Sequence, residues 1–568
     1  MMPKTKLELT WIGKENRPKL EPRVLIEDPE KSYHAAHHVS ESDIFDNRLI
    51  FGDNLLALKA LEQEFTGKIK CVCIDPPYNT GSAFEHYDDG IEHSLWLSMM
   101  RDRLDVIRGL LTTDGTVWVF VDDNEAHYLK VLMDEVFGRP NHVQTVIWQR
   151  KASPANDAKW LSNDHDYILL YAKDKASWRP NRLTRTEAQK SYYTNPDNDP
   201  RGPWNSVTYT SNKSKAERPN LWYAIINPNT GEKVWPGTTV TWRCNPETHA
   251  ENVKNNLLYW GKDGKAKMPR LKRFLDDANA VVPRSVWLHE DVGHTQMAMV
   301  ESKALFDQPF ATPKTEAVIA RIVDIATRGR EWVLDSFAGS GTTGAVAHKM
   351  GRRWIMVELG EHCHTHIIPR MKKLIDGEDQ GGISRAVNWN GGGGFRYYRL
   401  GPTLIVQDEW GNPVINPQFN PAMLAEAMCK LEGFTFDPDP EIYWQQGKST
   451  ETDFIYVTTQ FMSKQMLTKL SDEVGPTRSL LICCSAFRCD VSQFENLTVK
   501  KIPKAVLKKC EWGHDDYSLE VANLPDAPPQ ISEQQQHEPE RQARRFGKDK
   551  DADPTLFDMG ATGPKGAK

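Results

Sequence analysis

The sequence predicts an α/β fold in which helices cover a mainly parallel sheet, with an inserted domain in the middle and a carboxyl-terminal α+β domain. Short apolar runs that end at Pro, Gly or Asp alternate with segments whose apolar residues recur at helical spacing. This alternation fades after about residue 176, where Gly, Pro, Asn, Thr and Trp dominate, and resumes near residue 299. The 568 residues suffice for several domains with cores of their own.

The first part of the α/β region contains five predicted strands. A short strand, a turn and a helix that opens near Asp53 or Asn54 are predicted for NRLIFGDNLLALKAL. The next strand, KIKCVCI, is stopped by two prolines, and a helix follows in SLWLSMMRDRLDVIRGLL. Further strands are predicted for GTVWVFVDD, HVQTVIWQR and DYILLYAK.

The alternation continues after the insertion. An amphipathic helix is predicted for TEAVIARIVDIAT, a strand, a glycine turn and a helix for WVLDSFAGSGTTGAVAHKM, and a strand for RWIMVEL. The four glycines at 391–394 predict a linker. A further domain, with strands in DFIYVTT and SLLICCSAF, reaches about residue 524. The polar segment after it cannot bury a core and is predicted to be disordered.

The composition is that of an ordinary soluble globular protein, with 39% hydrophobic and 26% charged residues and a mean hydropathy of −0.58. No apolar run approaches 18 residues, and the start lacks the apolar core of a secretory signal, so no membrane partner is expected. The nine cysteines show neither a disulfide framework nor zinc-finger spacing. These features predict a reducing, cytoplasmic location and no metal site.

Positive charge and tryptophan are concentrated in the middle of an acidic chain. The whole sequence carries a formal net charge of −6, yet residues 141–300 hold 23 lysines and arginines against 16 acidic residues, and nine of the 18 tryptophans. Such a region suits a groove for phosphates and bases. The same composition also suits core tryptophans beneath solvated charges, so it does not by itself establish nucleic-acid binding.

A glycine-rich turn follows the predicted strand that ends at Leu334. GSGTTG has the G-x-G-x-x-G spacing of a dinucleotide site, with Glu358 about 20 residues further on. A P-loop is excluded because Ala345 stands where its lysine belongs. The wider DSFAGSGT, with Asp335 before the turn, suits S-adenosylmethionine. The glycines would enclose its methionine part, and the acid at the end of the next strand would bind its ribose. The glycine pattern alone leaves NAD, S-adenosylmethionine and a ligand-free turn open.

The second motif is DPPY, Asp75–Pro76–Pro77–Tyr78, at the carboxyl end of a predicted buried strand. The prolines restrict the backbone and remove two N–H donors, so the Pro76 carbonyl and the Asp75 carboxylate can serve as paired acceptors. Tyr78 offers a face on which a planar ring can stack. Two acceptors for one NH₂ group, beside an aromatic face, are typical of a site that reads the exocyclic amine of a base. A dehydrogenase has no use for such a site.

Together the motifs resemble those of the β class of DNA amino-methyltransferases, in which the catalytic motif precedes the cofactor motif. The resemblance covers about residues 45 to 375, including IFGDNLLAL, SLWLSMMRDRL, GTVWVFVDD, DYILLYAK, GHTQMAMVESKALF and TPKTEAVIARI. The overall sequence is most similar to modification subunits of type III restriction–modification systems. The resemblance implies a Rossmann-like methyltransferase fold, S-adenosylmethionine as cofactor, and methylation of adenine N6 in double-stranded DNA by base flipping. It further implies two protein partners, a second copy of the chain and a restriction subunit with helicase and nuclease activities.

The resemblance also implies roles for individual residues. The catalytic loop is Asp75, Pro76, Pro77 and Tyr78. Asp53 lies by the adenine of the cofactor, Glu358 binds the ribose hydroxyls, and Lys314 lines the carboxylate end, although this chain reads TPKT where relatives often read KP. The remaining cofactor residues are Asp335, Phe337, Ala338, Gly339, Ser340, Gly341 and Thr342.

The insertion is expected to recognise DNA. Its densest basic run consists of Lys262, Lys265, Lys267, Arg270, Lys272 and Arg273, which could contact phosphates or form a solvated loop. The expected domains are an amino-terminal lead-in (1–45), a catalytic half (46–176), an inserted target-recognition domain (177–298), a cofactor half (299–385), a carboxyl-terminal domain (395–526) and a disordered tail (527–568).

Three alternatives remain open. Adenine is favoured over cytosine because relatives with an acid at the first motif position more commonly methylate adenine, yet a cytosine-N4 methyltransferase would use the same acceptors. A recognition subunit that mainly binds DNA is a second alternative, which the intact DPPY and GSGTTG motifs disfavour. A nicotinamide enzyme is the third, and it should bind NAD and ignore S-adenosylmethionine.

Overall fold

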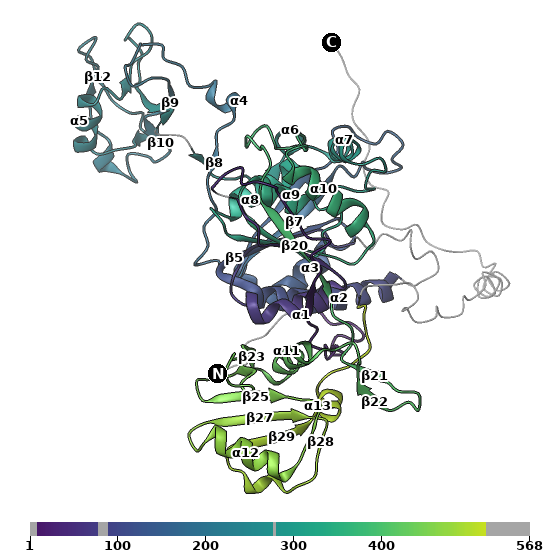
Figure 1. The fold of residues 1–568 in the computed structure, drawn as a ribbon. Helices are drawn as coiled ribbons and strands as arrows, with labels where there is room; N and C mark the ends of the chain where they lie inside the picture. The colour runs from purple at the N-terminus through teal and green to yellow at the C-terminus, as the bar shows by residue number, and fades with distance from the viewer. Residues whose placement is uncertain (1–7, 42, 78–88, 277–279, 518–568) are drawn as a thin grey trace, which may run out of the picture.

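The computed structural model describes residues 8–41, 43–77, 89–276 and 280–517. An eleven-stranded sheet with helices on both faces forms its central body (Figure 1). From edge to edge the strands are β1 (Leu25–Glu27), β20 (Gly394–Leu400), β3 (Asn47–Phe51), β19 (Arg353–Glu358), β18 (Trp332–Asp335), β4 (Ile69–Ile74), β5 (Leu111–Val121), β7 (His165–Ala172), β6 (His142–Gln149) and β17 (Val286–Trp287), and β2 (Tyr33–His34) pairs with β20.

Most neighbouring strands of this sheet run parallel. β20, β3, β19, β18, β4 and β5 share one direction, whereas β7 runs antiparallel between β5 and β6, and β1 and β2 pair antiparallel with β20. The predicted α/β fold with a mainly parallel sheet is therefore confirmed. Because parallel strands end at the same edge, β3, β19, β18 and β4 deliver the segments that follow them to one side of the body.

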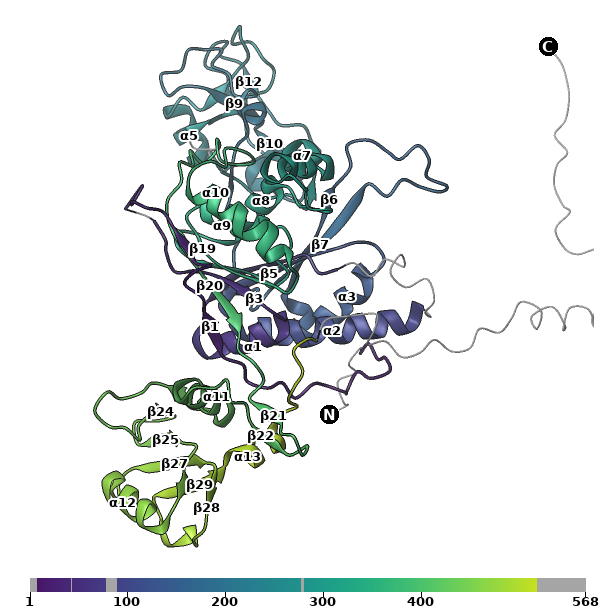
Figure 2. The same ribbon diagram turned by 45° about the vertical axis from the view of Figure 1, so that its right-hand side comes forward.

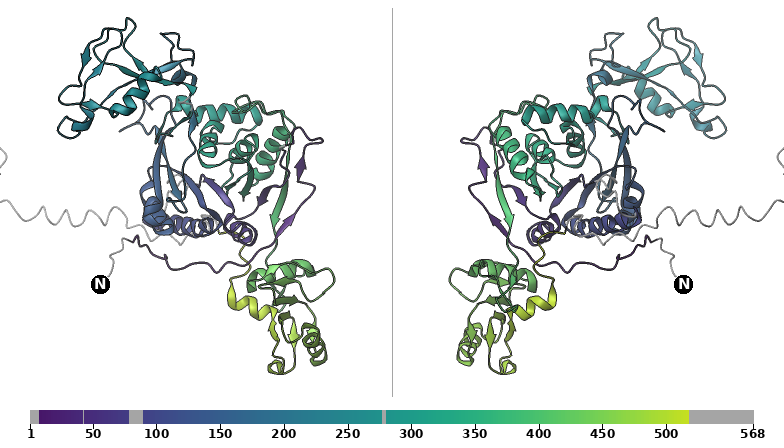
Figure 3. Two further views of the ribbon diagram at one scale, coloured as in Figure 1. Left: turned by 90° about the vertical axis from the view of Figure 1, so that its left-hand side faces the viewer. Right: turned by 90° about the vertical axis from the view of Figure 1, so that its right-hand side faces the viewer.

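Helices cover both faces of the sheet (Figure 3). On one face lie α1 (Asn54–Phe65), α2 (Asp89–Leu110) and α3 (Ala126–Met133), and on the other α8 (Glu316–Ala326), α9 (Thr342–Lys349) and α10 (Ile368–Ile375). Short π-helical turns, Asp134–Gly138 and Cys363–Ile367, follow α3 and precede α10. α1 begins where the sequence predicts, because the Asp53 carboxylate caps it by accepting from the Leu56 amide at 2.9 Å.

The inserted domain forms a separate lobe (Figures 1 and 2). A two-stranded neck, β8 (Leu183–Thr184) with β16 (Ala280–Val281), connects it to the body. Its core contains Tyr209, Ile225, Trp242 and Trp260. The lobe is built from β9 (Trp204–Thr208), β15 (Arg270–Phe274), β14 (Leu258–Tyr259), the pairs β10 (Thr210–Ser211) with β13 (Thr241–Trp242) and β11 (Ile225–Ile226) with β12 (Lys233–Val234), and the helices α4 (Glu187–Lys190) and α5 (Pro246–Lys254).

The body resumes earlier than the expected boundary at residue 298. β17 pairs with β6, and Trp287 is buried in the core of the sheet. α6 (His289–Val292) and α7 (Thr295–Leu305) then lead into α8. The boundary shifts because a two-residue strand leaves no periodicity that the sequence could reveal.

The segment expected to be a loosely ordered lead-in is attached to the body. β1 and β2 both pair with β20, and the buried Lys14 donates to Glu135 Oε2 at 2.9 Å. Ion pairs and short edge strands make these contacts, which explains why hydrophobic periodicity does not reveal them.

The four glycines expected to form a linker are tightly packed instead. Gly391, Gly392 and Gly393 have φ angles of +93°, +104° and +75°. A Cβ on Gly393 would stand 2.7 Å from the Ile44 carbonyl oxygen, so the close approach requires glycine. β20 starts directly afterwards and joins the central sheet, although the sequence assigns it to the carboxyl-terminal domain.

The carboxyl-terminal domain lies at the opposite end of the body from the inserted lobe (Figure 1). The two strands predicted from DFIYVTT and SLLICCSAF are present as neighbours, β25 (Asp453–Val457) and β27 (Ser479–Cys484). Their sheet also contains β23 (Thr435–Phe436), β24 (Gly447–Lys448) and β29 (Leu497–Lys501), and the domain adds β21 (Ile405–Gln407), β22 (Pro413–Ile415), β26 (Phe461–Met462), β28 (Ala486–Phe487), α11 (Pro421–Glu432), α12 (Lys464–Val474) and α13 (Ile502–Lys509).

The predicted disordered tail, 527–568, lies outside the described residues. Within the described part of the chain, none of the helices combines the length and apolar character that crossing a membrane requires.

Candidate functional site

A cavity of about 940 Å³ opens at the edge where the parallel strands end. Both sequence motifs line it: Asp75, Pro76 and Pro77, which follow β4, and residues 335–340, which begin at the last residue of β18. The motifs are 260 residues apart in the chain and meet because β4 and β18 are parallel neighbours. The cavity is therefore assembled by the sheet and not by one contiguous segment.

The glycine turn between β18 and α9 forms one wall of the cavity. Gly339 and Gly341 have φ angles of +53° and +75°, which side chains with a Cβ rarely adopt. A Cβ on Gly339 would lie 3.5 Å from Phe310 Cζ, and both residues line the cavity. The third glycine, Gly344, has another role: a Cβ there would stand 2.3 Å from Met356 Cε, so it permits α9 to pack closely on β19.

Glu358 presents its carboxylate to the cavity at the end of β19. Its Oε2 accepts from the Gly339 amide at 2.7 Å, and its Oε1 accepts from the Gly360 amide at 2.9 Å. His362 Nε2 lies 2.9 Å from the same Oε1, and this hydrogen bond raises the pKa of His362. The acid predicted to bind ribose hydroxyls is thus held beside the glycine turn.

Asp335 is the last residue of β18 and is almost completely buried. Its Oδ1 accepts from the Phe337 amide at 2.9 Å, which shapes the start of the turn. Burial raises the pKa of this carboxyl to about 7. A cationic group entering the cavity would favour the ionised form, so this acid can respond to a charged ligand.

Asp75 lines the cavity directly after β4, the strand next to β18. Its Oδ2 pairs with Lys314 Nζ, and its buried Oδ1 accepts no hydrogen bond from any described residue. The Lys314 ammonium lies 5.2 Å from the centre of the Phe120 ring, which also lines the cavity. Lys314, expected at the carboxylate end of the cofactor, thus contacts the predicted catalytic acid directly.

The loop after Asp75 is held from α2. The indole Nε1 of Trp96 donates to the Pro77 carbonyl oxygen at 2.8 Å, and Pro76 is buried. Tyr78, the fourth residue of the predicted catalytic loop, lies outside the described residues. Trp96 was not identified from the sequence, where its helical spacing indicates only a core residue.

Asp53, expected to lie by the adenine of the cofactor, has structural contacts of its own. Besides capping α1, its carboxylate lies 3.3 Å from the buried Arg103 guanidinium, and it is not among the residues that line the cavity. Its neighbour Asn54 does line the cavity, donating to the Ser336 carbonyl oxygen at 2.7 Å and accepting from Arg103 Nε at 2.5 Å. Asp53 thus positions the start of α1, and with it Asn54, at the edge of the cavity.

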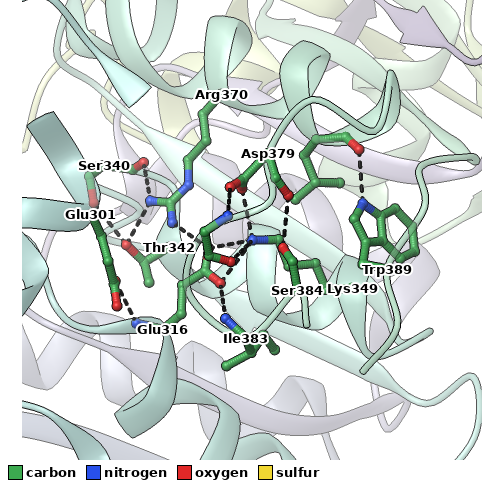
Figure 4. A network of polar contacts seen from close by, with 12 residues as sticks. Glu301, Glu316, Ser340, Thr342, Lys349, Arg370, Asp379, Ile383, Ser384 and Trp389 are labelled. Carbon is green, nitrogen blue, oxygen red and sulfur yellow. Dashed lines mark hydrogen bonds and ion pairs between the residues drawn. The ribbon is translucent and has the colours of Figure 1, made fainter. Parts of the chain in front are cut away.

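A buried polar network braces the glycine turn from behind (Figure 4). Arg370 on α10 donates to the Ser340 carbonyl oxygen at 3.2 Å, to Thr342 Oγ1 at 2.9 Å and to Glu316 Oε1 at 2.9 Å. Lys349 Nζ lies 2.9 Å from both Glu316 oxygens. Because Glu316 opens α8 two residues after Lys314, one network holds both the turn and the segment that reaches Asp75.

The predicted phosphate-binding run is divided by the structure. The side chains of Lys262, Lys265, Lys267, Arg270 and Arg273 are exposed on the inserted lobe. Lys272 is buried on β15, paired with Asp197 and, at 2.9 Å, with Asp199. Lys272 therefore stabilises the lobe and is not available to phosphate, because strand alternation turns it inward.

A comparison with protein families finds a match to a family described as DNA methylase, over residues 69–369. Similar curated proteins include the probable type III HindVI Mod subunit of Haemophilus influenzae, 30% identical over 63% of this chain and 54% of that protein. The EcoP15I Mod subunit of Escherichia coli is 27% identical over 72% of this chain and 73% of that protein. The type II methyltransferase M.EcaI of Enterobacter cloacae is 30% identical over 56% of this chain and 67% of that protein. The chain spans about half the length of the HindVI relative.

Proposed function

The chain belongs to the DNA methylase family, and from this premise we propose that it transfers a methyl group from S-adenosylmethionine to the N6 amine of adenine in duplex DNA. The observation that carries the proposal is the convergence of Asp75 and the glycine turn on one cavity. A dehydrogenase would use the glycine turn but would not need Asp75 beside it. A subunit that only binds DNA would need neither the glycine turn nor Asp75.

The cavity fits S-adenosylmethionine. Gly339 leaves space where any other residue would place a Cβ beside Phe310. The Glu358 carboxylate, at the end of the strand after the turn, suits the ribose hydroxyls, and the buried Asp335 suits the positively charged methionine part. When bound, the cofactor supplies a methyl group made electrophilic by a sulfonium, so the protein does not have to activate the donor.

The residues of the chain must instead activate and position the acceptor. The lone pair of an adenine amine is delocalised into its ring, and hydrogen bonds from both N–H groups would localise it. Asp75 Oδ1, buried and without a described donor, is one acceptor, and the Pro76 carbonyl is the proposed second. Lys314 holds the other carboxylate oxygen and so orients Asp75. Holding the amine in line with the methyl supplies much of the rate.

The target amine cannot reach such a cavity inside a duplex, so we propose that the base is flipped out. Its ring would stack on Tyr78, as the motif suggests. The inserted lobe would bind the surrounding duplex through its exposed basic residues. Adenine is proposed over cytosine because of the acid at position 75 and because several similar proteins are type III Mod subunits.

We further propose that the protein acts within a restriction–modification system, with a second copy of the chain and a restriction subunit as partners. The similarity to Mod subunits of type III restriction–modification enzymes supports a role in such a system. The nine free cysteines, seven of them buried, support the expected reducing, cytoplasmic location.

Methylation of plasmid DNA by the purified full chain tests the function. Incubation with S-adenosylmethionine, followed by nucleoside chromatography, should yield N6-methyladenine. N4-methylcytosine instead would establish the cytosine alternative, and no modified base would refute a methyltransferase.

The variant Asp75→Ala tests the proposed role of this carboxylate in methyl transfer. It should lower the methylation rate by at least about 1,000-fold, because it removes the acceptor for the amine. Calorimetry should still find S-adenosylmethionine bound within a few-fold of the wild-type affinity, since Asp75 faces the base. A parallel loss of cofactor affinity would contradict this role.

A further inference from the structure

A segment beyond the carboxyl-terminal domain returns to the cavity. Residues 511–517, which we call the strap, follow α13 and run back to the central body (Figure 2). The Glu511 amide donates to the Lys19 carbonyl oxygen at 2.8 Å, and the Gly513 amide donates to Thr403 Oγ1 at 2.9 Å. The buried Arg23 donates to the His514 carbonyl oxygen at 2.9 Å. The strap is therefore attached along its length.

The end of the strap is bonded to Arg103 of the cavity wall and to Asp53, which pairs with Arg103. The Tyr517 amide donates to Asp53 Oδ2 at 3.0 Å, and Arg103 donates to the Tyr517 carbonyl oxygen at 3.2 Å. Arg103 in turn donates to Asn54, and Asn54 donates to the Ser336 carbonyl oxygen. A continuous chain of hydrogen bonds thus leads from the strap to the first residues of the glycine turn.

Asp516, next to Tyr517, is itself part of the cavity wall, together with Arg103 and Asn54. The strands at the cavity edge follow in the order β3, β19, β18, β4. Asp75 follows β4 and Glu358 ends β19, while Asn54 opens α1 just after β3. β4 and β3 are three strand spacings apart, about 14 Å, which is long enough for the cofactor to lie along the edge.

The proposed function determines which end of the cofactor meets the strap. The reacting methyl must lie near Asp75, and the ribose near Glu358. The adenine of the cofactor must then extend past β19 toward Asn54, Arg103 and the strap. A carboxylate at that end can accept a hydrogen bond from the 6-amino group of the ring.

We propose that Asp516 of the strap binds the 6-amino group of the cofactor's adenine, so that a segment beyond the carboxyl-terminal domain completes the cofactor site. This inference rests on the proposed function. It assigns a specificity-determining role to a residue that lies 141 positions beyond the last helix of the central body, which ends at Ile375.

The test is calorimetry on the full chain with two probes, S-adenosylhomocysteine and S-inosylhomocysteine. The inosyl probe carries a 6-oxo group in place of the 6-amino group. The wild type should bind it about 10- to 100-fold more weakly, because Asp516 would then face an acceptor. Asp516→Ala should lose that preference by weakening the adenosyl probe. Asp516→Asn should bind the inosyl probe better than the wild type does, since its amide can donate to O6.

Asp515→Asn is the matched control, because Asp515 pairs with Arg23 and does not line the cavity. It should keep the wild-type preference. Failure of the wild type to bind the adenosyl probe would overturn the proposed function itself. Two outcomes would overturn only the role of Asp516. In one, the wild type binds the adenosyl probe and both Asp516 variants keep its preference for that probe. In the other, the variants lose affinity equally for both probes while their melting temperature is unchanged.

Discussion

At the scale of single residues, two acids of the cavity behave differently although both end strands of one sheet. Asp335 is almost completely buried, and this burial disfavours its charged form although Thr343 and the Phe337 amide hydrogen-bond the carboxyl. Glu358 reaches the cavity and is held by two backbone amides and His362. Burial therefore separates an acid that titrates near neutrality from one that serves as a fixed acceptor.

Asp335 makes stability depend on pH. Because burial raises its pKa to about 7, its contribution is fully present below the ordinary aspartate pKa and is lost as pH rises through 7. The melting temperature of the wild type should therefore fall relative to that of Asp335→Asn between pH 5.5 and pH 8.5. Thermal scans of both proteins measure this difference. Asp157→Asn, at an exposed position, is the control, and its melting temperature should follow that of the wild type. A difference in melting temperature between the wild type and Asp335→Asn that stays constant with pH would contradict the raised pKa of Asp335.

At the scale of elements, the glycine turn depends on backbone conformation. Gly339→Val forces a β-branched residue into a positive φ and adds bulk beside Phe310. S-adenosylmethionine binding should fall at least 100-fold by calorimetry. The comparison variant is Gly351→Ala, which also has a positive φ of +70° but lies at the far end of α9 with no atom within 4 Å of its Cβ. It should bind the cofactor normally, and tight binding by Gly339→Val would refute the cofactor assignment.

The inserted lobe contains two kinds of lysine: Lys265 and Lys267, before β15, are exposed, and Lys272, on β15, is buried. Lys265→Ala with Lys267→Ala removes two exposed charges and should lower the salt slope of duplex binding by about 1.8 if each contacts a phosphate. Lys272→Ala should instead lower the melting temperature, because breaking a buried ion pair costs about 3–5 kcal/mol. Salt titrations and thermal scans of both proteins distinguish the roles. An unchanged slope in the double variant would exclude this run from phosphate contact.

At the scale of the whole molecule, the chain forms a body with a lobe at each end (Figure 3). The strap links the carboxyl-terminal lobe back to the cavity, which Asp516 lines. The insertion lies between two segments of the chain that both contribute strands to the central sheet, such as the neighbours β4 and β18. The proposed binding of DNA by the inserted lobe and of cofactor by the body can therefore be altered by separate substitutions.

Two deletions separate the strap from the tail. Removal of residues 527–568 leaves every strap contact in place, so the melting temperature and cofactor affinity should stay unchanged. Removal of residues 511–568 also deletes the contacts of the strap with Arg103 and Asp53, and should weaken S-adenosylmethionine binding at least tenfold. Equal behaviour of the two proteins would show that the strap has no part in the site.

The sequence by itself determined the α/β class, the two motifs and the family. These depend on local signals: strand and helix periods, the glycine spacing of GSGTTG, and DPPY at a strand end. These signals can be recognised in the sequence alone because each of them arises from residues that are close together in the chain.

Only the tertiary structure decided which side chains meet. Lys314 pairs with Asp75, although the two are 239 residues apart in the sequence. Arg103 of the cavity donates to the carbonyl oxygen of Tyr517 in the strap, which is 414 residues away. The burial of Lys272 and the packing of Gly393 against Ile44 likewise depend on which strands become neighbours. No local pattern encodes these pairs, because their partners are set by the order of strands in the sheet and by the folding of distant segments onto its edges.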